Sequence, residues 1–171
     1  MKKNHDNDKI SIMDITKEWT DTQENTGQVI WKQEYMLNGN VYRVDGYHVI
    51  INPSKKEVAI AEVLANKYGK KVELIPRVLL PQKIQTPDYL IDGVRYDLKS
   101  PTGSGKDIFR DMIKKKRKQS PNFIFDVTNC PLCDEEVERQ VQGIFAAQNT
   151  KFVQQVVLVR NDIVIGAYQR K

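Results

Sequence analysis

The chain has 171 residues, of which 40% are hydrophobic and 29% charged, and its net charge is +5. This length suits one domain with a sizeable core, and the composition is typical of a globular soluble protein. No stretch approaches the roughly 18 apolar residues that a membrane span needs, and no apolar segment follows the basic N-terminus, so neither a membrane anchor nor a signal peptide is expected. The positive charge suits a polyanionic partner such as nucleic acid.

Residues 1–28 are polar and contain several turn-forming residues, which predicts an N-terminal arm or spacer. Residues 29–171 are expected to form one domain, made of an N-terminal hairpin at 29–51 and a core at 52–171. Asn38-Gly39 favours the tight turn of that hairpin, because both residues tolerate positive φ angles. Its two strands are predicted at 29–37 and 41–51.

Helices and strands alternate in the core. Ser54 is a natural N-cap for a helix at 55–68, and Gly69 is a natural residue to end it. The alternation predicts an α/β fold with a mixed central β-sheet flanked by helices. The remaining elements are predicted at 72–80 (strand), 88–99 (hairpin), 106–118 (helix), 122–128 (strand), 134–148 (helix), and 152–160 and 163–169 (strands).

The hairpin at 88–99 carries the candidate chemistry. Asp92-Gly93 predicts a two-residue turn, and the resulting register places Asp88 opposite Asp97, with Lys99 on the same face. The two carboxylates would lie roughly 5 Å apart at Cβ, which is destabilising unless a divalent cation offsets their charge. A surface cluster of salt bridges is the alternative. The other face is predicted to meet the core, with Tyr89, Ile91, Val94, Tyr96 and Leu98.

A third carboxylate is predicted on the helix at 55–68. Ile60, Leu64 and Tyr68 define its buried stripe, and Glu57 lies on that stripe. A buried carboxylate is costly unless it is paired or binds a metal, so Glu57 is a candidate ligand beside the two aspartates. The alternative is that Glu57 only complements the helix dipole. The expected cation is Mg²⁺ or Mn²⁺, because both favour carboxylate oxygens.

A basic segment follows the hairpin. Its cationic side chains recur at helical spacing, which predicts a positive stripe that binds the phosphates of a nucleic acid. A merely solvated helix face is the alternative. The residues of the predicted stripe are Lys106, Arg110, Lys114 and Arg117.

Two further residue types are interpreted as structural. Cys130 and Cys133 stand in a C-x-x-C arrangement at a predicted strand-to-helix junction, but they are too few for a closed zinc site. His48 falls in a predicted strand, where a lone histidine is more often structural than catalytic.

The motifs resemble a known superfamily. Pro87-Asp88, eight residues, and then Asp97-Leu98-Lys99 are similar to the PD-(D/E)XK nuclease signature. The stretches TPDYLIDG, YDLKSP and NFIFDVTN, with the lysine-rich segment between the last two, resemble the C-terminal tRNase domain of CdiA contact-dependent growth inhibition toxins. Carried over, the resemblance makes Asp88 and Asp97 metal-binding acids, Lys99 the catalytic lysine and Glu57 the acid that many members carry on a helix.

This resemblance implies a restriction-endonuclease-like core and a metal-dependent endonuclease that cleaves tRNA as a bacterial toxin. It also implies a cognate immunity protein and a cytoplasmic site of action after delivery into a target cell. Three alternatives stay open. The chain could be a DNA endonuclease that uses the same residues, a metal-independent RNase toxin working through His48, or a non-catalytic phage-associated protein that binds nucleic acid through the helix at 106–118.

Overall fold

The computed structural model describes residues 12–21 and 26–171. Its larger sheet contains β1 (Ile12–Asp14), β2 (Gln28–Trp31), β6 (Lys71–Leu74), β8 (Tyr89–Ile91), β9 (Val94–Lys99), β10 (Asn122–Asp126), β11 (Gln155–Arg160) and β12 (Ile163–Arg170). The helices are α1 (Thr16–Thr20), α2 (Lys55–Tyr68), α3 (Ile108–Ile113), α4 (Asp134–Ala146) and the 3-10 helix η1 (Gln148–Thr150). Two small sheets pair β3 (Glu34–Leu37) with β4 (Asn40–Arg43), and β5 (Val49–Ile50) with β7 (Arg77–Val78).

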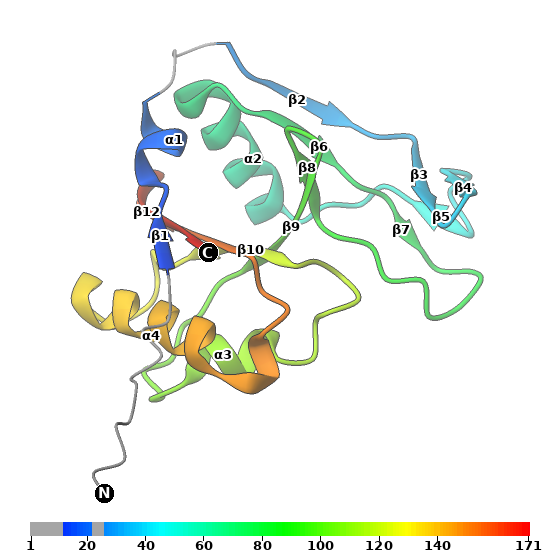
Figure 1. Ribbon diagram of the computed structural model, residues 1–171. Coiled ribbons are helices and arrows are strands. Elements are labelled where there is room, and N and C mark those ends of the chain that lie inside the picture. The colour runs from blue at the N-terminus through cyan, green and yellow to red at the C-terminus, as the bar shows by residue number, and fades with distance from the viewer. Residues whose placement is uncertain (1–11, 22–25) are drawn as a thin grey trace, which may run out of the picture.

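The large sheet is mixed and has the strand order β1-β12-β11-β10-β9-β8-β6-β2. Its centre is parallel, because β10 pairs in parallel with both β9 and β11, whereas β8 pairs antiparallel with β9 and with β6. Helix α2 covers one face, and α3 and α4 cover the other (Figure 1). The prediction of an α/β fold with a mixed central sheet flanked by helices is therefore confirmed.

The alternation of side chains along β10 explains the two layers. Ile124 packs into the cluster on the α2 face, whereas Phe123 and Phe125 pack into the cluster around α3 and α4. All five residues of this strand are buried, as expected for a parallel strand covered on both faces. The two hydrophobic cores fix the sheet between the helices and hold the β8–β9 hairpin at its place.

Helix α2 begins and ends where the sequence predicts. The Ser54 hydroxyl accepts a hydrogen bond from the Glu57 amide (3.1 Å), which caps the first turn. Gly69 ends the helix with φ 64°, in the left-handed region that favours glycine. The cap places Glu57 in the first turn of the helix, next to the β8–β9 hairpin.

The β8–β9 hairpin has the predicted register. Asp92 and Gly93 both have positive φ angles, 49° and 82°, as the predicted two-residue turn requires. Tyr89 pairs with Tyr96, so the next position along each strand sets Asp88 against Asp97. Four of the five residues predicted to face the core are buried or half-buried. The exception is the exposed Val94, which directly follows the turn at the end of the hairpin.

The N-terminal hairpin turn is confirmed, but the long strands predicted around it are wrong. The strand predicted at 29–37 is divided between two sheets, since β2 pairs with β6 and β3 pairs with β4. The second run breaks after Arg43, where Asp45 Oδ1 accepts the backbone amides of residues 47, 48 and 49 and draws the chain into a turn. The strand predicted at 72–80 also divides into β6 and β7, because Pro76 has no amide to donate to a ladder.

The helix predicted at 106–118 is much shorter in the structure. Helix α3 comprises only Ile108–Ile113, and the lysine-rich residues after it form successive turns. Five consecutive cations at 114–118 would repel one another along a helix, and Pro121 disfavours a helical conformation for the residue before it. The later elements keep their predicted order, and each has one end as predicted and the other shifted by one to three residues.

Part of the predicted N-terminal arm packs on the domain. Strand β1 pairs with β12, and the Trp19 side chain of α1 is buried edge-to-face against Tyr96. The first eleven residues of the arm, and residues 22–25, lie outside the described part of the chain. None of the described helices is long and apolar enough to cross a membrane.

Candidate active site

A pocket of about 440 Å³ opens where the first turn of α2, the β8–β9 hairpin and the loop after β7 meet. It brings together Glu57, Asp88, Asp97 and Lys99, which the sequence predicts as one site. The other wall residues come from the segment between β6 and β8, which includes β7, from Leu98 of β9, and from one position before β10. They are Ile75, Arg77, Val78, Leu79, Ile84, Gln85, Thr86, Pro87, Leu98 and Gln119.

Asp88 stands at the point where the antiparallel ladder ends. Its Oδ2 accepts a hydrogen bond from the Leu98 amide (2.8 Å), so a side chain takes the place of the next backbone carbonyl. Its own carbonyl accepts the Ile75 amide (3.2 Å) from the neighbouring chain. These two bonds fix the carboxyl group toward Asp97.

The environment of Asp88 favours its neutral form. Burial raises the pKa of Asp88 to about 8, and the negative charge of Asp97 and a hydrogen bond with its carboxylate add to this effect. The Leu98 amide acts in the opposite direction, and the charge of Glu57 raises the Asp88 pKa further. Asp88 is therefore expected to keep its proton at neutral pH when no cation stands beside it.

Asp97 is the most buried acid of the pocket, with 1% of its surface exposed. Lys99 Nζ lies 2.6 Å from its Oδ2, which makes a close ion pair within the same strand. The approach lacks the angles of a hydrogen bond, and Oδ2 has no hydrogen-bond partner among the described residues. A divalent cation that binds this oxygen must therefore share it with the Lys99 ammonium or displace that group.

Glu57 reaches the pocket from α2. The Tyr89 hydroxyl donates a hydrogen bond to its backbone carbonyl (2.7 Å), which ties the helix to the hairpin. Its carboxylate accepts a hydrogen bond from Arg77 Nη2 (3.1 Å), and its side chain is 15% exposed. Arg77 belongs to β7 and carries no motif that would have indicated a role in the site.

The donor set suits a hard divalent cation, but it is not assembled around one. Asp88 and Asp97 offer adjacent carboxyl oxygens, the ligands that Mg²⁺ and Mn²⁺ favour. Glu57 is engaged by Arg77 and Asp97 by Lys99. Among the described residues, no three His, Cys, Asp or Glu side chains already stand together as a metal site. The two aspartates therefore fit as a metal-binding pair, and Glu57 can join them only by moving.

The four predicted phosphate-binding cations do not form one stripe. Lys106 borders a hollow at the start of α3, whereas Lys114 and Arg117 border a different hollow beside Phe152. Arg110 pairs with Asp107 (3.0 Å) and Lys114 with Asp111 (3.1 Å). The single stripe is wrong because it depended on a helix that ends at Ile113.

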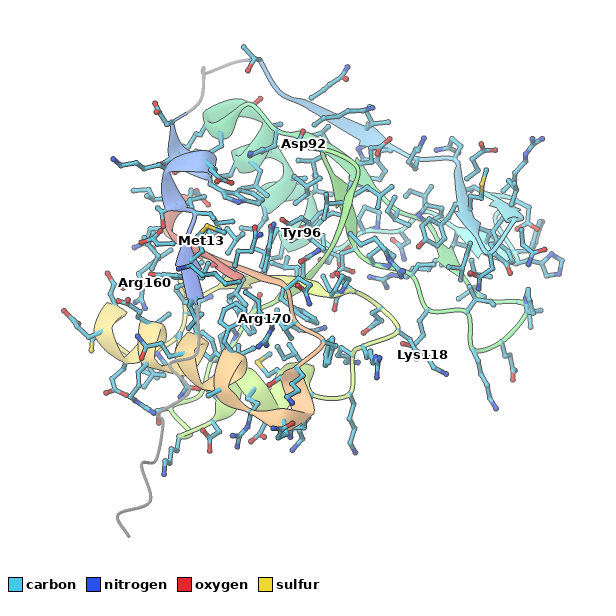
Figure 2. All side chains as sticks on the ribbon, in the orientation of Figure 1. Met13, Asp92, Tyr96, Lys118, Arg160 and Arg170 are labelled. Carbon is cyan, nitrogen blue, oxygen red and sulfur yellow. The ribbon has the colours of Figure 1, made fainter. Side chains whose placement is uncertain are left out.

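Another part of the basic segment adjoins the pocket. Arg95 of β9 donates hydrogen bonds from Nη2 to the carbonyls of Lys118 (3.2 Å) and Gln119 (2.7 Å). This clamp holds the last basic turn beside the pocket wall, and Lys118 projects from that turn (Figure 2). The Gln119 side chain lines the pocket, and its buried Oε1 has no hydrogen-bond partner among the residues described. Gln119 belongs to no motif that would have indicated a role of its own.

Other residues considered in the sequence lie apart from the pocket. His48 is exposed and pairs with Asp45 (2.8 Å) on the turn after β4. Cys130 is buried beside α4, and Cys133 is exposed at its N-cap; both are free thiols. Neither the histidine nor the cysteines line the pocket.

Comparisons with known proteins give one family and one solved structure. No curated protein matches the chain. A chain of the CdiA-CT/CdiI toxin and immunity complex from Burkholderia pseudomallei has a similar fold, with a TM-score of 0.54 and 18% sequence identity, over 84% of this chain and 98% of that one. The matched region contains three of the four site residues, Asp88, Asp97 and Lys99, whereas Glu57 lies before it. This region is residues 85–164, which match the family model of the contact-dependent growth inhibition CdiA C-terminal domain.

Proposed function

We propose that this protein is a divalent-metal-dependent nuclease of the PD-(D/E)XK type, that it acts as a contact-dependent growth inhibition toxin, and that its substrate is tRNA. The observation that carries the proposal is the adjacent pair of the half-buried Asp88 and the buried Asp97, with Lys99 beside it, in an open pocket. Similarity of residues 85–164 to the CdiA C-terminal domain supports the toxin role.

The residues divide the chemistry in the following way. Asp88 and Asp97, joined by Glu57, would hold Mg²⁺ or Mn²⁺ through carboxylate oxygens. The bound cation would lower the pKa of a water molecule and offset charge on the attacked phosphate. Lys99 stabilises the negative charge that develops on the phosphate oxygens, since its ammonium lies within the same pocket. Asp88 would have to lose its proton to bind the cation, because only the carboxylate is a good ligand.

The biological setting follows from the same similarity. The related fold belongs to a toxin and immunity complex. We therefore expect a cognate immunity protein for this chain, delivery into a target cell, and action on the nucleic acids of the cytoplasm. A metal-independent RNase centred on His48 gains no support, because that side chain lies outside the pocket.

Digestion of purified tRNA and of plasmid DNA, each with Mg²⁺ and with EDTA, tests the proposal. The expected result is cleavage of tRNA at defined positions with Mg²⁺, none with EDTA, and intact plasmid. Cleavage of the plasmid alone would show that the substrate is DNA and not tRNA. Cleavage in EDTA would show that the reaction does not need a divalent metal. If neither nucleic acid is cut with Mg²⁺ or Mn²⁺, the chain is not a nuclease of this type.

A further inference from the structure

Two ion pairs offset the charge of two of the three acids of the pocket, Asp97 and Glu57. Lys99 pairs with Asp97 inside one strand, whereas Arg77 crosses from β7 to reach Glu57 on α2. The Arg77 side chain is 50% exposed and lines the pocket wall, so solvent and a substrate can both reach its guanidinium group. The chain thus places a strong phosphate-binding group at the pocket and engages it with a candidate metal ligand.

The Glu57 carboxylate cannot keep its hydrogen bond with Arg77 and also bind a cation beside Asp88 and Asp97. Its Oε1 accepts the Arg77 hydrogen bond, and no three acidic side chains in the described segments are already gathered as a metal site. For Glu57 to join Asp88 and Asp97, it must weaken or break its contact with Arg77. The released guanidinium would then stand at the same wall, with a planar set of donors that matches a phosphate group.

We propose that Arg77 exchanges partners: it holds Glu57 while the site lacks a cation, and it binds a phosphate of the nucleic-acid backbone once Glu57 becomes a metal ligand. The inference rests on the proposed nuclease function and deepens it, because it makes metal binding and substrate binding mutually supportive. A permanent orienting role, with Arg77 bonded to Glu57 throughout, predicts different behaviour.

Metal affinity separates these two roles without any measurement of cleavage. Titration calorimetry with Mn²⁺ alone on the full chain compares wild type, Arg77→Ala, Arg77→Lys and the control Arg43→Ala. Arg43 is also an arginine paired with a glutamate, but it lies on the β3–β4 hairpin outside the pocket. Loss of a half-exposed ion pair should tighten Mn²⁺ binding by about two- to fivefold in Arg77→Ala. The control should match wild type.

Substrate affinity gives the second, opposite signature. The affinity for unfractionated tRNA is measured in the presence of Mn²⁺ and in the presence of EDTA. All variants carry Lys99→Ala, which is expected to prevent cleavage. With Mn²⁺, Arg77→Ala should weaken tRNA binding by about tenfold and lower the salt slope by about 0.7 to 0.9. With EDTA the same substitution should change binding by less than about twofold, because Arg77 is then occupied by Glu57. Arg77→Lys keeps the charge but not the planar set of donors, so its tRNA affinity should lie between those of wild type and Arg77→Ala.

The outcomes are distinct. Weaker Mn²⁺ binding in Arg77→Ala would overturn the exchange and make Arg77 an orienting residue. An equal loss of tRNA affinity with and without Mn²⁺ would also overturn it, because linkage between the two ligands must be reciprocal. If wild type binds no Mn²⁺ at all, the proposed metal site fails together with the exchange. Thermal unfolding of each variant confirms that the changes do not come from misfolding.

Discussion

At the scale of single residues, Asp88 shows how the turn of a hairpin builds a site. A two-residue turn four positions away fixes the register, and the register sets two carboxyl groups against each other. The Leu98 amide then holds one of them in place. Because every step is local, sequence reasoning could predict Asp88, Asp97 and Lys99 as neighbours.

The raised pKa of Asp88 has a consequence for stability. The folded protein binds this proton up to about pH 8, whereas the unfolded chain loses it near pH 3.9. The stability that the protonated Asp88 contributes to the folded state is therefore fully present below about pH 4 and is lost as the pH rises through about 8. In EDTA, we expect wild type to lose stability relative to Asp88→Asn over this range, as measured by urea unfolding. The asparagine keeps an acceptor for Leu98 and carries no charge. If the free energy of unfolding depended on pH in the same way in the two proteins, the raised pKa of Asp88 would be contradicted.

Arg77 and Gln119 mark the limit of prediction at this scale. Arg77 lies on the two-residue strand β7 and Gln119 lies on the turn before β10, and neither segment has a period or a turn motif that fixes its path. The unpartnered Gln119 Oε1 becomes visible only when the burial of that atom is known. Residues placed by long-range packing could not be found from spacing alone.

At the scale of elements, α2 and α3 show opposite outcomes. Both limits of α2 were predictable, because Ser54 and Gly69 act on the backbone next to them. The basic helix was not, because helical spacing of cations says nothing about whether the segment has a reason to be helical. After Ile113 no apolar residue remains to pack against the core, and the like charges are better separated in turns.

This difference changes which cations should bind the substrate. Lys118 is held beside the pocket by the Arg95 clamp, whereas Lys106 borders a separate hollow. Lys118→Glu should therefore weaken tRNA binding more than Lys106→Glu, with a salt slope that is lower by about 0.7 to 0.9 per lost contact. Filter binding over a range of salt concentrations measures both. Equal effects would indicate that only the net charge of the chain matters.

At the scale of the whole molecule, the sheet is sandwiched between two cores, and strands that are neighbours in the chain lie at its opposite edges. β1 joins the far edge, while β2 follows it in sequence but closes the opposite edge. The sequence predicted the class of the fold, because alternating helices and strands are a local signal. It could not predict that the segment containing β1 and α1 packs on the sheet, since that contact joins residues about 150 positions apart.

The packing of that segment predicts a stability effect. Trp19 is 5% exposed and lies against Tyr96, whereas Trp31 is 48% exposed. Trp19→Ala should lower the free energy of unfolding by about 3 kcal/mol or more. Trp31→Ala should change it by less than about 0.5 kcal/mol. Urea unfolding followed by circular dichroism compares them. Near-wild-type stability of Trp19→Ala would mean that residues 12–21 contribute little to the fold.

The most direct measurement of the central claim is single-turnover cleavage of tRNA in Mg²⁺ by wild type, Asp97→Asn and Glu73→Gln. Glu73 is a suitable control because it is also a buried strand carboxylate paired with a lysine, at 3.4 Å from Lys32, but it does not line the pocket. We expect Asp97→Asn to cleave at least about a hundredfold more slowly than wild type and Glu73→Gln to keep nearly the whole rate. Cleavage by Asp97→Asn at the wild-type rate would show that Asp97 is not a catalytic residue.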